Sequence, residues 1–314
     1  MGLERKAMSS MTRVGVVGAG RVGAVLAAAL RAAGHEISAV AGESAASRTR
    51  AEMLLAGVHV DKPTAVARSC DLLLLTVPDD MLSNVVSMLA AAGAVRTGQR
   101  VVHTSGKHGL AVLEPAARRG ADVLALHPAM TFTGTDLDLG RLPGCVYGVT
   151  ATERTRELAE SLVDDLDGRV AWVAEEHRTL YHAGLAHGAN HLVTLVAQAM
   201  DLLRASGATD PAGTLRPLLS AALDNALTYG DAALTGPIVR GDVQTVRAHL
   251  ADIAATNPAS LEAYVAMARA TAHRAVLDGR LLPIRAGTLA AVLDDALAGR
   301  AAGRAADRTA GRTG

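Results

Sequence analysis

The sequence predicts an α/β protein in which a doubly wound, mostly parallel sheet is followed by an all-helical C-terminal domain. Residues 13–34 contain a β-branched strand, a glycine-rich turn and an Ala/Leu helix, in that order. Short apolar runs bounded by turn residues then recur to residue 173, which is typical of strands buried in a parallel sheet. From Glu175 onward the patterns are helical. We therefore expect a first domain over 12–174, a helical domain over 175–298 and a disordered tail over 299–314.

The glycine-rich turn is Gly18-Ala19-Gly20-Arg21-Val22-Gly23. Its first glycine allows a tight turn, its second lets backbone approach a pyrophosphate, and its third lets the helix pack closely on the sheet. The helix then directs its N-terminal N–H groups at the phosphates. A glycine-rich turn in an unrelated α/β fold is the alternative, but the strand before it and the helix after it favour a dinucleotide-binding unit. Cofactor contacts are predicted for Gly18, Gly20, Arg21, Val22 and Gly23.

The second strand, residues 36–41, ends where such folds distinguish NAD from NADP. An acidic residue there accepts hydrogen bonds from the ribose hydroxyls of NAD, whereas Ser and Arg hold the 2′-phosphate of NADP. The chain offers Glu43 for the first role and Ser44 and Arg48 for the second, with Arg50 nearby. These arginines could instead only solvate the next helix. The sequence leans towards NADP, and NAD stays possible.

Five further strands are predicted, and polar residues follow several of them. The run 72–77 ends at Val77-Pro78-Asp79, which should border the cofactor, with Asp79 as the N-cap of the next helix. The run 100–104 leads into His103 and the loop after it, and the run 123–126 leads into His127. Strands over 145–149 and 169–173 complete the sheet. Helices are then expected over 176–206, 211–230, 242–254, 258–278 and 286–298.

The composition excludes several classes of function. Basic and acidic residues number 31 each, so no nucleic-acid-binding or membrane-binding charge is indicated. The two cysteines, Cys70 and Cys145, have no metal-ligand spacing and are expected to be packed thiols. No apolar run reaches the roughly 18–20 residues that span a bilayer, and residues 1–11 lack the apolar region of a signal peptide. We expect a soluble cytoplasmic protein without a metal site.

The order of motifs resembles the 6-phosphogluconate dehydrogenase-like superfamily. More specifically, it resembles a bacterial Rossmann-like family whose C-terminal half is known only as a domain of unknown function. The resemblance implies an NADP-dependent oxidoreductase that reduces a small 2-oxo acid, of the ketopantoate reductase type in pantothenate biosynthesis. The matching pieces are Val77-Pro78-Asp79-Asp80, His103-Thr104-Ser105-Gly106, His127-Pro128 with Phe132, Tyr181-His182-Ala183 with Asn190, and Leu234-Thr235-Gly236-Pro237 with Arg240-Gly241-Asp242 and His249.

The resemblance also assigns site residues, with one departure. His103 borders the cofactor, and Ser105 and Gly106 occupy the loop that holds a substrate carboxylate in the superfamily. The better-known members carry a catalytic Lys four residues before an Asn on the first long helix between the domains. Here Asn190 matches that Asn, but Ala186 stands at the Lys position. Another residue must therefore donate the proton.

Histidines and one lysine are the candidate proton donors. On an ideal helix His182 and Asn190 lie about 80° apart, so His182 could be the acid while Asn190 orients the substrate; a packed core histidine is the alternative. His127 could take part or could only fix its turn, and Lys107 could donate a proton or remain a solvated loop charge. Arg240 could bind the substrate carboxylate or pair with Asp242.

Three functions remain open. The first is ketopantoate-type reduction in the cleft between the domains. The second is reduction of an imine or a β-hydroxyacid-type substrate by a relative of the same superfamily. The third is a non-catalytic dinucleotide sensor. In each case the partner is a small molecule, and the Ala-rich helical half suggests a homodimer.

Overall fold

The computed structural model describes residues 11–310, with side chains through residue 299. It divides into two compact units, and the chain passes from the first to the second between Gly188 and Ala189. This division lies beyond residue 174, because the first helix after the sheet packs with the first unit. Residues 1–10, for which the sequence predicts no signal peptide, and residues 311–314 lie outside the described residues.

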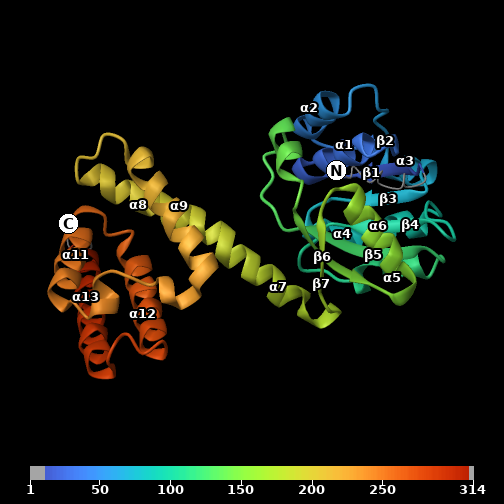
Figure 1. The fold of residues 1–314 in the computed structure, drawn as a ribbon. Helices are drawn as coiled ribbons and strands as arrows, with labels where there is room; N and C mark the ends of the chain where they lie inside the picture. The colour runs from blue at the N-terminus through green and yellow to red at the C-terminus, as the bar shows by residue number, and fades with distance from the viewer. Residues whose placement is uncertain (1–10, 311–314) are drawn as a thin grey trace, which may run out of the picture. The chain divides into compact units, whose positions relative to one another are not determined.

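The first unit is built on one seven-stranded sheet with the order β2-β1-β3-β4-β5-β6-β7 (Figure 1). All neighbouring strands are parallel except β5 and β6, which are antiparallel. This confirms the doubly wound, mostly parallel sheet, and each of its strands falls on a predicted run. The strands are β1 Arg13–Val17, β2 Glu36–Ala41, β3 Leu72–Leu75, β4 Arg100–His103, β5 Asp122–Pro128, β6 Val146–Ala151 and β7 Arg169–Trp172.

Helices cover both faces of the sheet because side chains along each buried strand alternate between two cores. In β3, Leu72 and Leu74 face one core, whereas Leu73 and Leu75 face the other. The first core is closed by α1 Arg21–Ala32, α2 Ala45–Leu54 and α6 Arg156–Asp165. The second is closed by α3 Pro63–Ser69, α4 Asp79–Ala91, η1 Ala111–Leu113 and α5 Glu114–Ala117. Short 3₁₀ turns lie at η2 Asp136–Arg141, η3 Glu153–Thr155 and η4 Glu175–His177.

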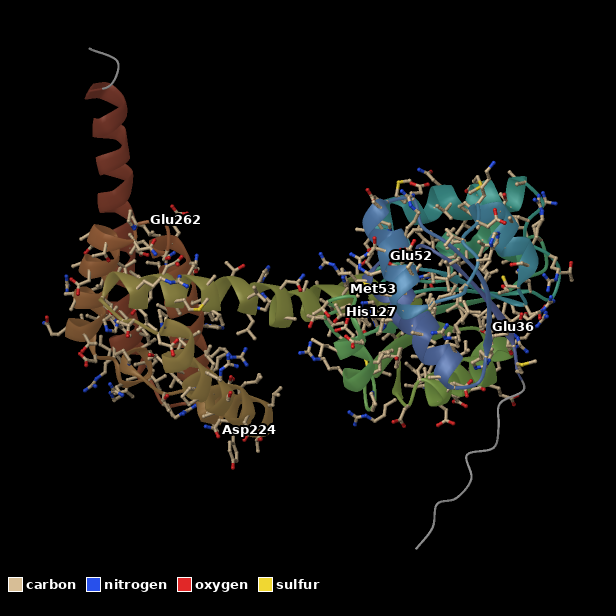
Figure 2. All side chains as sticks on the ribbon, turned by 90° about the horizontal axis from the view of Figure 1, so that it is seen from above. Glu36, Glu52, Met53, His127, Asp224 and Glu262 are labelled. Carbon is tan, nitrogen blue, oxygen red and sulfur yellow. The ribbon has the colours of Figure 1, made fainter. Side chains whose placement is uncertain are left out.

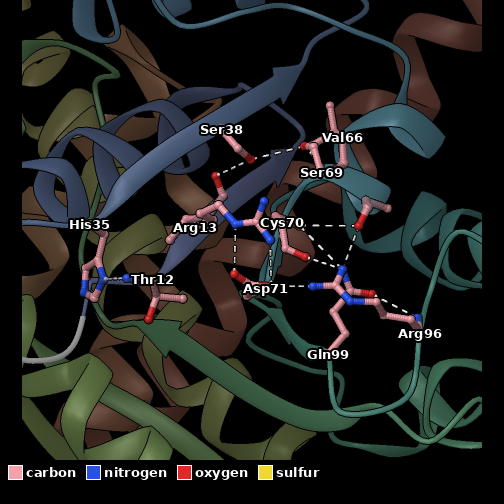
Figure 3. Close-up of polar contacts among 12 residues, drawn as sticks. Thr12, Arg13, His35, Ser38, Val66, Ser69, Cys70, Asp71, Arg96 and Gln99 are labelled. Carbon is pink, nitrogen blue, oxygen red and sulfur yellow. Dashed lines mark hydrogen bonds and ion pairs between the residues drawn. The ribbon is translucent and has the colours of Figure 1, made fainter.

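Polar side chains at the amino-terminal edge of the sheet bond to one another and to backbone (Figure 3). Asp71 accepts from Arg13 Nε at 3.1 Å and from Arg96. The buried Gln99 side chain donates to the carbonyl oxygens of Ala67 at 2.7 Å and Cys70 at 3.0 Å. Burial raises the pKa of Cys70 to about 11, so this thiol is a packing group. These contacts stabilise the amino-terminal edge of the sheet. Ligands of doubly wound sheets bind at the opposite edge, at the carboxyl ends of the strands.

The second unit is entirely helical within its described residues (Figure 1). Its core is formed by α10 to α13 and contains Val246, Leu250, Val265, Leu289 and Leu293. By contrast, α8 has no buried residue and α9 buries only Pro211 and Leu215. Asp224 on α9 is one of its exposed positions (Figure 2). The elements are α8 His191–Ala205, α9 Pro211–Tyr229, η6 Gly230–Ala233, α10 Pro237–Arg240, α11 Val243–Thr256, α12 Leu261–Leu277 and α13 Pro283–Ala310.

Two helical regions differ from the sequence expectation. The single helix expected over 176–206 consists of α7 Arg178–Leu185, a π-helical turn at Ala186–Asn190, and α8. The wider π turn makes the 80° calculated between His182 and Asn190 wrong, because that value assumes 3.6 residues per turn throughout. In addition, α13 runs to Ala310, into the segment expected to be disordered, which agrees with the high helix propensity of Ala and Arg.

None of the helices described is long and apolar enough to cross a membrane.

Candidate functional site

A cavity of about 1010 Å³ opens at the carboxyl ends of the central strands. This is the edge at which doubly wound sheets bind ligands. Its walls come from the turns after β1, β2, β3 and β4. They include most of the predicted cofactor residues: Gly18, Gly20, Arg21, Val22, Glu43, Ser44, Arg48, Val77, Pro78 and Asp79, together with Ser105.

The glycine turn is held against β3. Gly18 has φ +107°, which favours glycine, and a Cβ there would lie 2.7 Å from the Thr76 carbonyl carbon. A Cβ on Gly23 would overlap both Gly18 O and Thr76 Oγ1, and Thr76 Oγ1 donates to Gly18 O at 2.5 Å. The start of α1 therefore sits directly on the sheet. Because its first turn carries no acidic residue, the positive end of the helix dipole is left for an anion.

Basic and hydroxyl side chains gather beyond the end of β2. Ser44, Ser47, Arg48 and Lys62 line the cavity there, together with Glu43. The Arg48 guanidinium donates to the Glu43 carbonyl oxygen at 2.7 Å, and this contact holds it at the cavity wall. Lys62 and Ser47 were missed by the sequence reasoning. Lys62 is one of three lysines in the chain and directly precedes the proline that begins α3. Its rarity and its place before a helix were the sequence features that could have identified it.

Arg50 and Asp79 differ from expectation. Arg50 does not line the cavity; it lies beside Gly134, where a Cβ would come within 2.7 Å of its Nε. Asp79 is the first residue of α4 rather than its N-cap, which is Pro78. Its carboxylate still stands in the first turn, where it complements the helix dipole while bordering the cavity.

His103 shapes the loop that follows β4. The ring is fully buried, its Nδ1 accepts from the Ser105 amide at 3.1 Å, and its Nε2 bonds the Gly109 carbonyl oxygen at 2.8 Å. The amide can only donate and the carbonyl can only accept, so the ring is neutral with its proton on Nε2. Burial lowers the pKa of His103 to about 4. This corrects the prediction that His103 contacts the cofactor, because both nitrogens of its ring are hydrogen-bonded to backbone groups.

The same loop presents Ser105 to the cavity and Gly106 to two histidines. Ser105 Oγ accepts from the His108 amide at 3.2 Å, which leaves its hydroxyl proton available to a ligand. A Cβ on Gly106 would overlap the His182 ring and lie 3.1 Å from His127 Nε2. Only glycine lets this loop approach both rings.

The histidine cluster consists of His127, Tyr181 and His182, and His127 is labelled in Figure 2. His127 stands at the end of β5, and the other two lie on α7. The His127 ring meets the His182 ring edge to face at 5.9 Å, and its Nδ1 hydrogen-bonds Tyr181 OH at 3.1 Å. Burial, reinforced by the positive charge of Arg178, lowers the pKa of His127 to about 4. The structure thus brings together His127, His182, Ser105 and Gly106 within the first unit.

The other predicted catalytic and substrate-binding residues are exposed. Lys107 is exposed and does not line the cavity. Asn190 and Arg240 are exposed residues of the second unit. Asp242, the alternative partner of Arg240, caps α11 by accepting from the Thr245 amide at 3.1 Å and from its hydroxyl at 2.7 Å. Across residues 11–299 no group of three or more His, Cys, Asp or Glu is arranged to hold a metal ion.

Arg178 was missed by the sequence reasoning. It is 1% exposed and donates to the carbonyl oxygens of Ser105 and Gly148, the latter at 3.0 Å, and to Thr150 Oγ1 at 3.4 Å. A buried arginine with neutral partners only is uncommon. In the sequence, an arginine in the first turn of a helix looks the same whether it is buried or solvated, so nothing indicated the burial of Arg178.

Acidification should destabilise the protein through His103. The unfolded residue has a pKa of about 6.5, above the folded value of about 4. The unfolded state therefore binds the proton first, and stability is lost as the pH falls from about 6.5 towards 4. Between pH 6.5 and 5 the loss from this residue is about 2 kcal/mol. Urea unfolding at both pH values should show a smaller loss in His103→Gln.

His59→Gln is the control for this measurement, because His59 is an exposed histidine of the same unit. Its pH dependence should match that of the unmodified protein. An equal pH dependence in His103→Gln would show that His103 is not held neutral by the fold.

Comparison with known families and structures agrees with this architecture. Residues 4–128 match the Rossmann-like domain family, and residues 145–271 match a domain of unknown function, DUF2520. No curated protein matches the chain.

Solved structures with this fold have low sequence identity to the chain. A Bacteroides fragilis protein assigned as an NADP oxidoreductase has 21% identity and a TM-score of 0.71, covering 84% of this chain and 98% of its own. The protein TM1727 from Thermotoga maritima has 19% identity and a TM-score of 0.62, covering 84% and 99%. An imine reductase from Myxococcus stipitatus, in complex with NADP+, has 18% identity and a TM-score of 0.60, covering 91% and 94%. The chain is therefore a Rossmann-like domain joined to a DUF2520 domain, the family that its sequence motifs indicate.

Proposed function

We propose that the protein is an NADPH-dependent reductase of a small 2-oxo acid, of the ketopantoate reductase type. The observation that carries this proposal is the juxtaposition of two features in the first unit. One is the cavity beside the glycine turn, and the other is the Ser105–Gly106 loop, whose two residues face the cavity and the His127–His182 pair respectively. A dinucleotide in the cavity would extend from the glycine turn towards this loop. The imine reductase noted above supports nicotinamide-dependent reduction on this fold.

NADP rather than NAD is favoured by the charges beyond β2. Arg48 and Lys62 supply two cations, and Ser44 and Ser47 supply hydroxyl groups, at the position where the 2′-phosphate differs from a ribose hydroxyl. Glu43 also lines this wall, but its backbone carbonyl holds the Arg48 guanidinium in place. The pyrophosphate would lie on the first turn of α1, beside Arg21.

The chemistry needs a hydride and a proton. A bound nicotinamide supplies the hydride. The substrate carboxylate is held by the Ser105 hydroxyl and the Gly106 amide. His182 then gives its proton to the developing alkoxide, replacing the lysine that the family resemblance would place at Ala186. His127 is kept neutral by burial and is oriented by Tyr181, so it hydrogen-bonds the substrate oxygen rather than serving as the acid. The roles of Asn190 in orienting the substrate and of Arg240 in binding its carboxylate stay predictions from the sequence.

Cofactor preference is tested by Arg48→Ala and Lys62→Ala. Each substitution should weaken NADPH binding about tenfold or more, because a charge-assisted hydrogen bond to phosphate contributes about 1.5–3 kcal/mol. NADH binding should change little. Nicotinamide fluorescence titration measures both affinities. Arg119→Ala, which removes an exposed arginine of the same unit, is the control. Equal losses for NADPH and NADH would argue against a 2′-phosphate site.

Catalysis is tested by following NADPH oxidation with ketopantoate, other 2-oxo acids and cyclic imines. His182→Gln should lower kcat about 10²-fold or more, because a positioned general acid contributes about that factor, while NADPH affinity is retained. His59→Gln is the control. Turnover of imines alone would favour the imine reductase alternative. Tight NADPH binding without turnover of any substrate would favour the sensor.

We also propose that the second unit pairs with a second copy of the chain. Every residue over 220–229 of α9 is exposed, including Leu223, Leu227 and Tyr229, and α8 exposes Leu192, Val193 and Leu195. Helices are normally stabilised by packing an apolar face, so such faces favour a protein partner.

Light scattering after size-exclusion chromatography tests this pairing. The protein should elute as a dimer, and Leu227→Glu should shift it towards monomer. Leu277→Glu, at another exposed leucine, should not. A monomer at all concentrations would contradict the proposal.

A further inference from the structure

The Ser105–Gly106 peptide is oriented by a buried cation. Arg178 extends from the first turn of α7, and one of its terminal nitrogens donates to the Ser105 carbonyl oxygen. The other terminal nitrogen donates to Gly148 O on β6 and to Thr150 Oγ1. Thr150 Oγ1 itself donates to Val173 O at 2.6 Å, so it is set to accept from Arg178. The guanidinium group therefore ties the loop after β4 to strand β6.

Holding this carbonyl also sets the direction of the next amide. The described backbone has no cis peptide bond, and in a trans peptide the C=O and the following N–H point in opposite directions. With Ser105 O turned to Arg178, the Gly106 N–H points away from it. Gly106 is buried, and no described residue accepts a hydrogen bond from this amide. The site thus holds a buried donor for an anionic ligand, beside the Ser105 hydroxyl.

Two carboxylates, those of Glu175 and Asp79, favour the charged form of Arg178 through space. No described carboxylate forms an ion pair with it, and its Nε is buried without a hydrogen-bond partner. Glu175, three residues before Arg178, is instead turned to the loop, where it accepts from the Leu110 amide at 2.6 Å and the Ala111 amide at 3.1 Å. Arg178 and Glu175 therefore hold the two ends of the 105–111 segment, and the buried Arg178 guanidinium lies behind it.

We propose that Arg178 is a positioning residue that fixes the Ser105–Gly106 peptide and holds a buried positive charge without an ion pair behind it, so that this loop binds the carboxylate of the substrate. This inference rests on the proposed function for the identity of the ligand. Arg178 itself lies behind the loop and binds it through Ser105 O. Its effect on a carboxylate is therefore transmitted by the Gly106 N–H and by the field of the buried charge.

The first test is carboxylate binding. Oxalate, which presents a carboxylate beside a second oxygen as a 2-oxo acid does, is titrated calorimetrically into the NADP+-bound protein. Arg178→Met should weaken oxalate binding at least tenfold and leave the NADP+ dissociation constant within about threefold. Arg178→Lys should give an intermediate loss, because it keeps the charge but not the guanidinium fork. Arg119→Met, at an exposed arginine, is the control.

A role only in stability would produce a different result. Arg178→Met would then lower the midpoint of urea unfolding but leave oxalate binding to the folded fraction unchanged, and this result overturns the proposal. If Arg178→Met does not fold, Arg178→Lys is used instead. Unchanged oxalate binding in Arg178→Lys would show that the two-nitrogen contact of the guanidinium with Ser105 O and β6 is not required, and this result overturns the proposal.

The second test does not depend on substrate identity. The charged and titratable groups around His127 are Arg178, His182, Asp79 and His103, with Tyr181 on its Nδ1. Nuclear magnetic resonance of the unmodified protein should show a His127 ring that stays neutral to about pH 4. In Arg178→Met the pKa of His127 should rise, because the positive charge of Arg178 adds to the effect of burial in lowering it, and the Gly106 amide should exchange at least tenfold faster.

These two tests separate the proposals. If the unmodified protein does not bind oxalate but both resonance changes occur, the 2-oxo acid function fails and the positioning role of Arg178 stands. If neither the Gly106 amide nor the His127 titration changes in Arg178→Met, the positioning role fails whatever the substrate.

Discussion

The close approach of Gly18, Gly23 and Thr76 is the constraint on which the first unit depends. A Cβ at Gly23 would overlap two oxygen atoms, so α1 can rest on β1 and β3 only with glycine there. This contact sets where α1 starts and therefore where its positive end points. The cavity, the basic wall beyond β2 and the loop after β4 are all arranged around that end. The site is a consequence of one packing requirement at the centre of the sheet.

Much of this fold is predictable from the sequence because its signals are local. Each strand is a short apolar run ended by Gly, Pro or a polar cluster, and the glycine turn combines three such signals within six residues. The π turn at Ala186–Asn190 has no such signal, since Ala, His, Gly and Asn there fit an α-helix equally well. The helical stretch beyond residue 299 follows from Ala and Arg propensity, which the repeated glycines obscured.

The candidate site is predictable only where it lies on a strand end. Ser105, Gly106 and His127 directly follow β4 or end β5, so parallel-sheet topology brings them to one edge. Arg178 and Lys62 are different, because a lone basic residue near a helix start is usually solvated. Burial of Arg178 depends on the packing of α7 against β6, which is a tertiary contact with no local pattern. For His103 the prediction was wrong in the opposite direction. As a polar residue at a strand end it was assigned to ligand binding, but its ring hydrogen-bonds backbone groups instead.

The alkylation rates of the two buried cysteines can report local unfolding of the first unit. Cys70 lies against Gly15, where a Cβ would come within 2.8 Å of its sulfur, and Cys145 is buried where β6 begins. Burial raises the pKa of both thiols, so neither reacts with an alkylating reagent while the structure is closed. The labelling rate of each thiol then measures how often the packing around that thiol opens. The two thiols therefore report local unfolding in different cores, Cys145 in the core that contains Leu72 and Cys70 in the core that contains Leu73.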